Sequence, residues 1–152
     1  MTDSAPPVDE EAESGETAIP EVNVETLHGS AVTSNNGQTV LHPNKDDYYD
    51  LVQILKDEGY GVCVDLCGAD YLGNETRSLP VTISAERFEL VVNLLDVHAS
   101  RRMRIRLQVS ETNPAVATIT DIHPGAEAME REANDMFGLE FKGHPDPTPI
   151  LL

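Results

Sequence analysis

The stretch RFELVVNLLDVHASRRMRIRLQV (residues 87–109) decides the fold. Residues 87–97 are almost continuously apolar, a pattern typical of a strand at the centre of a sheet. Residues 98–101 are few enough for a hairpin turn, and residues 102–109 then alternate between apolar and polar side chains. The stretch therefore predicts two neighbouring strands, the second with an outward polar face made of Arg102, Arg104, Arg106 and Gln108.

A second, smaller hairpin is expected upstream. Residues 31–33 and 39–41 flank Asn35-Asn36-Gly37, and an Asn-Gly pair supplies the positive φ angles that a tight hairpin turn requires. Residues 45–58 then have the period of a helix, which we expect Asn44 to cap and Gly59 to end. Its apolar face is made of Tyr48, Leu51, Val52 and Leu55.

A further strand is expected at residues 60–66, followed by a loop at residues 68–80. Strand alternation would place Val62, Val64 and Leu66 on one face. The other face would then carry Cys63, Asp65 and Cys67.

The last part of the chain combines an ambiguous segment, a helix and an arm. Residues 115–122 have helical spacing but the β-branched content of a strand, and Pro124 suits the first position of a helix. Gly138 is placed to end that helix, and prolines make residues 143–152 an extended arm that leaves the globule. The apolar face expected to hold the helix to the sheet is made of Met129, Ala133, Met136 and Phe137.

These elements predict an α+β fold in two layers. A mainly antiparallel sheet has one helix packed on it, a second helix follows, and an extended proline-rich arm ends the chain. We expect a disordered acidic tail at residues 1–26, a domain at residues 27–142 and the arm at residues 143–152.

Composition excludes several classes of function. The 152 residues hold 10 Lys and Arg against 27 Asp and Glu, for a net charge of −17, which argues against nucleic-acid binding. No apolar run is long enough for a membrane span, and no secretory signal is expected. Two cysteines and no signal suggest a reducing, cytoplasmic setting. Residues 1–44 hold eight acids and no Lys or Arg, which indicates a solvating tail or, alternatively, a partner-binding acidic arm.

The sequence contains no convincing catalytic, cofactor or metal site. Cys63 and Cys67 on one strand would be about 13 Å apart, beyond the reach of a disulfide or a shared zinc, so we expect structural thiols rather than a metal or redox site. The arginines on residues 102–106 could bind an anion or form a solvated face paired with nearby acids. On an edge strand, they would also block edge-to-edge pairing.

The densest group of charges is Glu130-Arg131-Glu132 with Asp135. One interpretation is a solvated helix face, and the other is a lattice of ion pairs at a contact between subunits. Along the helix, Arg131 has the spacing to pair with Glu127 and Asp135.

The segment from Glu130 to Leu151 resembles the signature of the C subunit of the respiratory NADH:quinone oxidoreductase (type I NADH dehydrogenase, complex I). The family pattern is E-R-E-x-x-D-[ML]-[FY]-G-[IL]-x-F-x-G-H-P-D, followed by I-L. Matching positions are Glu130, Arg131, Glu132, Asp135, Met136, Phe137, Gly138, Leu139, Phe141, Gly143, His144, Pro145, Asp146, Ile150 and Leu151. Residues 65–71 and 88–106 agree more weakly, so the resemblance covers about residues 38–152.

The chain departs from the family pattern in three places. Ala128 and Asn134 stand where relatives carry aromatic residues, and Pro147-Thr148-Pro149 replaces basic residues. The family continues past Ile-Leu through a segment with P-L-R-K-D-Y, so the resemblance implies a C-terminally shortened member.

The resemblance implies a non-catalytic subunit in the peripheral arm of a proton-translocating NADH:quinone oxidoreductase, on the cytoplasmic side of the cell membrane. It would scaffold the quinone-reducing module by binding the D subunit, with the B subunit of the same complex being a second partner and membrane contact only through the complex. No cofactor is expected on this chain; NADH, FMN, iron–sulfur clusters and quinone belong to the assembled complex. The expected interface residues are Glu130, Arg131, Glu132, Asp135, Gly138, Gly143, His144 and Pro145. The alternatives are a stand-alone acidic interaction module and the equivalent subunit of a related hydrogenase-type complex.

Overall fold

The computed structural model describes residues 2, 4 and 22–151. The acidic tail expected at residues 1–26 lies mostly outside the described residues, and so does Leu152. Within the described part, the first strand begins at Thr26, next to the predicted start of the domain.

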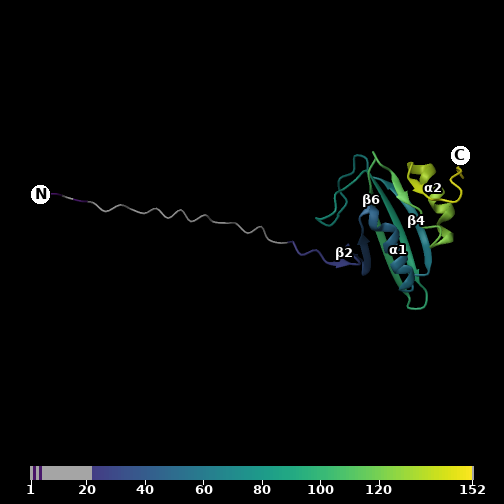
Figure 1. Ribbon diagram of the computed structural model, residues 1–152, viewed down its shortest axis with the longest axis horizontal. Helices are drawn as coiled ribbons and strands as arrows, with labels where there is room; N and C mark the ends of the chain where they lie inside the picture. Colours follow the sequence, from purple (N-terminus) through teal and green to yellow (C-terminus); the bar gives the residue numbers. More distant parts are fainter. Residues whose placement is uncertain (1, 3, 5–21, 152) are drawn as a thin grey trace.

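Six strands form one mixed but mostly antiparallel sheet in the order β1-β2-β3-β6-β5-β4. Only β3 and β6 pair in parallel. The long strands β4, β5 and β6 lie side by side (Figure 1). The strands are β1 (Thr26–Leu27), β2 (Ser30–Asn35), β3 (Gln38–His42), β4 (Val62–Asp70), β5 (Phe88–Asp96) and β6 (Arg101–Val109).

Both predicted hairpins are confirmed. β5 and β6 pair from Phe88 opposite Val109 to Asp96 opposite Arg101, and β5 lies inside the sheet between β6 and β4. β2 and β3 are joined by Asn36 and Gly37, whose φ angles are 50° and 78°. These positive angles match the twist of the flanking strands, which explains the Asn-Gly pair at this turn.

The first helix is confirmed with different bounds. A 3-10 turn, η1 (Lys45–Asp47), leads into α1 (Tyr48–Asp57), and all four residues of the predicted apolar face are buried. Asn44 accepts the Asp47 N–H through its backbone carbonyl at 3.1 Å, and its side chain does not cap the helix. Gly59 ends the helix with a φ of 111°, as predicted.

The face assignment in β4 is wrong because the strand contains a bulge. The register shifts between Cys63, opposite Leu94, and Asp65, opposite Asn93. The extra residue moves every preceding side chain to the other face of the strand. Leu66 is therefore buried while Val62 and Val64 are exposed. The strand also continues to Asp70, through residues expected to form a loop.

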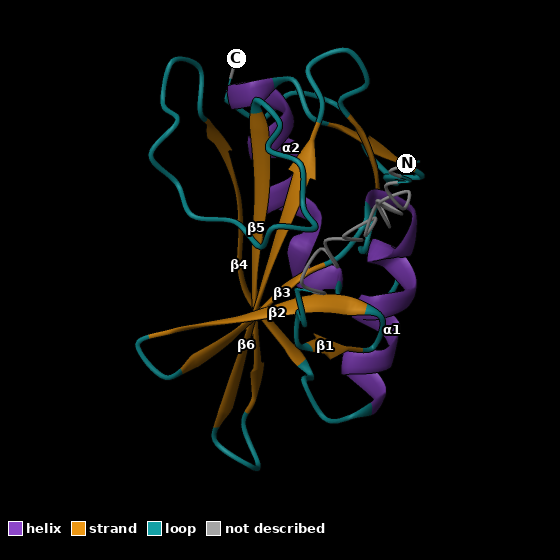
Figure 2. Cartoon of the chain, turned by 90° about the vertical axis from the view of Figure 1, so that its left-hand side faces the viewer, coloured by secondary structure: helices purple, strands orange, loops and turns teal. Residues whose placement is uncertain are grey.

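The second helix, α2 (Glu127–Phe137), follows a 3-10 turn, η2 (Pro124–Ala126), that begins at the predicted proline. It packs beside β4, and Figure 2 shows it behind β5. A Cβ atom built on Gly68 of β4 would lie 2.4 Å from the Phe137 ring, so the absence of a side chain lets the helix approach the sheet closely. Both helices share one apolar core with the sheet.

The C-terminal part returns to the domain. β7 (Ala115–Ala117) resolves the ambiguous segment as a strand at its start, and it pairs in parallel with β8 (Glu140–Lys142). The residues after β8 form hydrogen bonds with α2. The prediction that the arm leaves the globule is therefore wrong, whereas the predicted α+β class with a mostly antiparallel sheet is confirmed.

Candidate functional site

The signature helix α2 buries a different face from the one expected. Glu130 is fully buried together with Ala133, whereas Met136 is 61% exposed. Ala126, Glu130, Ala133 and Phe137 recur every three or four residues, so they form the stripe that faces the rest of the domain. The prediction that Met136 holds the helix to the sheet and that Glu130 is available to a partner is wrong for both residues.

The buried Glu130 carboxylate fastens the helix to the segment after β7. It accepts hydrogen bonds from the Ile119 N–H at 2.8 Å and from the Thr118 hydroxyl at 2.5 Å. His144 Nε2 lies 3.8 Å from the same carboxylate and 3.0 Å from the Glu127 carbonyl oxygen. Burial raises the pKa of Glu130, and the hydrogen bonds from Ile119 and Thr118 oppose that rise.

Arg131 and Asp135 hold the C-terminal arm rather than each other. The Arg131 guanidinium donates to the Thr148 carbonyl at 2.7 Å and to the Thr148 hydroxyl at 2.9 Å. Asp135 Oδ2 accepts the backbone N–H groups of Ile150 and Leu151, each at 2.8 Å. Among the described residues, Arg131 forms no ion pair with Glu127 or Asp135 along the helix. The side chains of Arg131 and Asp135 both turn to the arm instead.

Two glycines and a turn shape the path of the arm. Gly138 ends α2 in the left-handed region with a φ of 72°, as predicted. Gly143 has a φ of 87°, and a Cβ atom there would lie 3.3 Å from the Thr118 methyl group. Asp146 accepts the N–H and hydroxyl of Thr148, and these bonds lower the pKa of Asp146. Pro145 is exposed in the middle of this path.

The structure thus brings the eight predicted signature residues into one region but gives them different roles. Glu130, Arg131, Asp135 and His144 brace the domain and its arm, while Glu132 and Pro145 remain exposed. Exposed apolar side chains accompany them, namely Met136, Ile150 and Leu151. We call Glu132, Met136, Ile150 and Leu151 the outer α2 surface. It combines the exposed apolar side chains of the signature region with the exposed carboxylate of Glu132.

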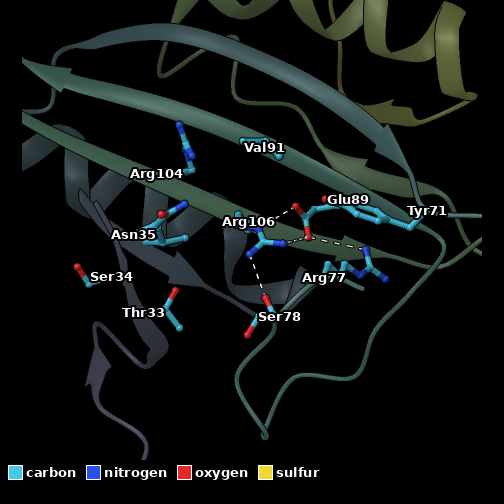
Figure 3. A pocket seen from close by; sticks show the side chains of 11 residues that line it. Thr33, Ser34, Asn35, Tyr71, Arg77, Ser78, Glu89, Val91, Arg104 and Arg106 are labelled. Atoms are coloured by element: carbon cyan, nitrogen blue, oxygen red, sulfur yellow. Dashed lines mark hydrogen bonds and ion pairs between the residues drawn. The ribbon is translucent and has the colours of Figure 1, made fainter. Parts of the chain in front are cut away.

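The predicted arginine face on β6 is only partly solvated. Arg106 forms a bidentate pair with the buried carboxylate of Glu89, at 2.8 and 3.0 Å (Figure 3). Arg104 donates to Asn93 at 2.9 Å. Because β3 pairs with the other side of β6, this strand is not at an edge, and its arginines do not have the edge-blocking role considered for that case. Sequence reasoning missed Glu89, and its position opposite Gln108 on neighbouring strands becomes visible only with the register.

Sequence reasoning also missed Thr118, Ile119 and Thr148, the partners of the signature residues. The one signal in the sequence is a run of β-branched residues at 116–122, which indicates secondary structure and not a site. Among the described residues, Cys63 and Cys67 are free, and no group of three or more His, Cys, Asp or Glu side chains could hold a metal ion. No helix in residues 22–151 is long and apolar enough to cross a membrane.

Two buried histidines make stability depend on pH. Burial lowers the pKa of both His42 and His123 to about 4, with help from Arg106 at His42 and from Lys56 at His123. Between about pH 4 and 6.5 the unfolded chain binds more protons at these sites than the folded chain. The stability contributed by the neutral histidines is therefore complete above pH 6.5 and is lost as the pH falls toward 4.

We expect His123→Gln to flatten this dependence. Urea unfolding of the full chain between pH 4.5 and 6.5 should show a shallower slope for the variant than for the unsubstituted protein, because one linked proton is removed. His98→Gln is the matched control, since His98 is exposed in the turn between β5 and β6. Equal slopes for His123→Gln and the unsubstituted chain would contradict the assignment.

The comparisons with known proteins agree with this fold. The profile of "Respiratory-chain NADH dehydrogenase, 30 Kd subunit" matches residues 41–152. The C subunit of the NADH-quinone oxidoreductase of Roseiflexus castenholzii is 37% identical over 119 residues, which is 76% of this chain and 63% of that protein. The C subunit of the Bordetella petrii enzyme is 34% identical over 131 residues, 80% of this chain and 63% of that protein. The chain spans 43–63% of the length of the curated relatives it matches.

Solved structures show the same architecture. The trypsin-resistant fragment (1–134) of Nqo5 superposes with a TM-score of 0.69 at 29% identity, covering 78% of this chain and 89% of the fragment. A chain of the membrane-bound sulfane sulfur reductase, an archaeal respiratory membrane complex, gives a TM-score of 0.63 at 20% identity, covering 76% of this chain and 63% of that one, and shows likeness of fold.

The fold is therefore of the class of α+β domains to which the Nqo5 fragment belongs. The chain belongs to the family of the 30 kDa subunit of respiratory-chain NADH dehydrogenase, represented in bacteria by the C subunit of NADH-quinone oxidoreductase. The resemblance inferred from the residues between Glu130 and Leu151 is confirmed.

Proposed function

We propose that this chain is a non-catalytic subunit of the peripheral arm of a proton-translocating NADH:quinone oxidoreductase. It scaffolds the quinone-reducing module by binding the D subunit, with the B subunit next to it, on the cytoplasmic side of the membrane. The chain itself binds no cofactor, and NADH, FMN, iron–sulfur clusters and quinone are handled by other subunits. Family membership and the outer α2 surface support this proposal.

One observation carries the proposal. The signature uses Arg131 and Asp135 to hold the arm against α2. The side chains of Ile150 and Leu151 remain exposed while their N–H groups bind Asp135, the residue before the exposed Met136. Burial of such side chains in water-excluding contacts is favourable by about 1.5–3 kcal/mol for each large side chain. A domain that fixes exposed apolar groups in place lowers the ordering cost of docking, because less conformational freedom is lost on binding.

The test compares two equally exposed apolar residues. The tagged full chain is used as bait in a pull-down of the co-expressed D subunit. We expect Met136→Asp to reduce recovery of the D subunit tenfold or more, because a charge would be buried at the contact. Val97→Asp is the matched control, since Val97 is 60% exposed and lies beyond the end of β5. Equal recovery with both variants would show that the outer α2 surface is not the contact.

Arg131→Ala tests how the surface is held. Arg131 bonds mainly to the arm, so its loss should change the unfolding free energy of the free chain by about 0–1 kcal/mol and still lower recovery of the D subunit. If this substitution unfolds the free chain, the signature serves to stabilise the core of the domain and not to hold the surface for a partner. Recovery of hydrogenase-type subunits in its place would favour the equivalent subunit of that complex, and recovery of no complex would favour a stand-alone acidic module.

A further inference from the structure

A cavity of about 600 Å³ opens on the sheet face away from α2. Its walls come from three separate parts of the chain, as Figure 3 shows: the end of β2 at Thr33–Asn35, the outward side chains of β5 and β6, and the long connection between β4 and β5. None of the outer α2 surface lines it. The cavity is therefore a second surface that the proposed function leaves unexplained.

The cavity carries an excess of positive charge in a chain whose net charge is −17. Three guanidinium groups, of Arg77, Arg104 and Arg106, face one carboxylate, Glu89. Glu89 is bound on both oxygens by Arg106 and also accepts Gln108 Nε2 at 2.6 Å. Arg104 donates to the neutral Asn93 amide, and no carboxylate of the described residues lies within ion-pair distance of it.

Arg77 provides a second observation that favours an anion in the cavity. Its side chain is only 8% exposed, and its Nη1 atom is buried without a hydrogen-bond partner among the described residues. Nη1 forms an ion pair with Glu89 Oε2 at 3.8 Å, and that oxygen also accepts bonds from Arg106 and Gln108. A buried charged donor that lacks an acceptor costs free energy, which a carboxylate entering the cavity would recover.

The sequence contains a segment with matching charge. Residues 1–21 hold seven Asp and Glu and no Lys or Arg, with Asp9-Glu10-Glu11 and Glu13 the densest group. We propose that this acidic segment binds in the cavity, with its carboxylates opposite Arg104 and Arg77. In this proposal, the partner of the acidic arm is the sheet of the same chain and not another protein.

The path of the backbone brings the segment to the cavity. β1 runs antiparallel to β2, with Thr26 opposite Ala31, and the Val32 N–H donates to the Glu25 carbonyl at 2.9 Å. This pairing makes residues 22–25 run toward the end of β2, where Thr33–Asn35 line the cavity. The six residue steps from Glu16 to Val22 can span about 20 Å, a reach that would allow the acids to enter the cavity.

Tethering makes weak ion pairs sufficient. Exposed pairs contribute about 0.2–1 kcal/mol each, too little for a separate peptide to bind well. A short tether raises the effective concentration of the segment to the millimolar range, so a few pairs occupy the cavity without a folded interface. The contact is also expected to be sensitive to salt, because its charges are partly exposed.

The experiment uses amide NMR of the full chain. We compare the native chain with a variant whose tail is neutralised by Asp9→Asn, Glu10→Gln, Glu11→Gln and Glu13→Gln. Neutralisation should shift the amides of Thr33–Asn35 and leave those of α2 in place. Raising the ionic strength from about 0.01 to about 1 M, which shortens the Debye length from about 30 to about 3 Å, should shift the same amides in the native chain only.

Two arginines of one strand give the matched control. Arg104→Gln should abolish the difference between native and neutralised tails, whereas Arg102→Gln should preserve it, because Arg102 is exposed on β6 outside the cavity. No shift on neutralisation, or equal effects of the two substitutions, would overturn the proposal. Shifts that grow with protein concentration would assign the contact to a second copy and overturn it as well. Binding to the D subunit is not involved, so the proposed function is tested separately.

Discussion

Glu89→Ala should lower the free energy of unfolding by about 3–5 kcal/mol, because it leaves partly buried guanidinium charge without a counter-ion. Glu89 is only 1% exposed and accepts two bonds from Arg106 and one from Gln108. Its removal also takes the nearest carboxylate from Arg77, whose Nη1 atom already lacks a hydrogen-bond acceptor among the described residues. Urea unfolding should show a lower midpoint with an unchanged m-value.

A second bidentate pair on the same sheet provides the control. Arg87 binds Asp70 at 3.0 and 2.9 Å, with the same fork geometry as Arg106 and Glu89 but nearer to solvent. Asp70→Ala should therefore cost only a small part of the loss seen for Glu89→Ala, because Arg87 keeps its ion pair with Glu111 and water replaces Asp70. Similar losses for the two substitutions would mean that water already solvates the Glu89 site.

The elements that the sequence predicted well are those decided by local pattern. Residues 87–109 form β5 and β6 because apolar continuity and strict alternation extend over nine residues in each strand. Helix α1 buries the predicted face for the same reason. In these segments the buried side chains are mostly apolar, so a periodicity of hydrophobic residues reports the true orientation.

Local pattern failed where a buried group is polar or where the period is interrupted. In α2 the buried stripe includes Glu130. The pattern of apolar residues alone therefore predicts a buried face that is turned toward Met136. In β4 the bulge between Cys63 and Asp65 reversed the alternation without any glycine or proline to mark it. Both errors arise because long-range partners, not neighbours in sequence, decide which side chain is buried.

In the candidate site, too, some features were predicted from the sequence and others depend on long-range partners. The resemblance grouped Arg131 and Asp135 in one signature but gave no partners for them. Their partners in the arm lie 15–17 residues away and are backbone groups or a threonine hydroxyl. Backbone N–H and C=O groups exist at nearly every position, so sequence alone has no means of singling out those of Thr148 and Ile150.

Glu130→Ala should destabilise the free chain by about 2–4 kcal/mol. The substitution leaves the buried Ile119 N–H without its acceptor, and an unpaired buried donor costs about 1–3 kcal/mol. A cavity beside Ala133 and His144 adds to the loss. Because the same carboxylate fixes the segment after β7, hydrogen exchange at Ile119 should also rise.

Glu130→Gln separates shape from charge. The amide oxygen can accept the Ile119 N–H, and the amide nitrogen can donate to the Thr118 hydroxyl, which turns toward Thr120 at 3.0 Å. Both contacts survive, so we expect a loss below about 1 kcal/mol. A loss as large as that of Glu130→Ala would mean that the negative charge itself, rather than hydrogen bonding, holds the helix.

The pH dependence of the unfolding free energy shows whether the negative charge on Glu130 stabilises or destabilises the fold. Since burial raises the pKa of Glu130, the folded chain holds this proton at pH values where the unfolded chain has released it. The stability contributed by the protonated carboxyl is thus greatest below the unfolded pKa and falls as the pH rises through the folded one. The difference in unfolding free energy between the native chain and Glu130→Gln should therefore decrease above about pH 4.5, while the histidine effects cancel. An increase would show that the bonds from Thr118 and Ile119 outweigh burial and keep the carboxylate charged.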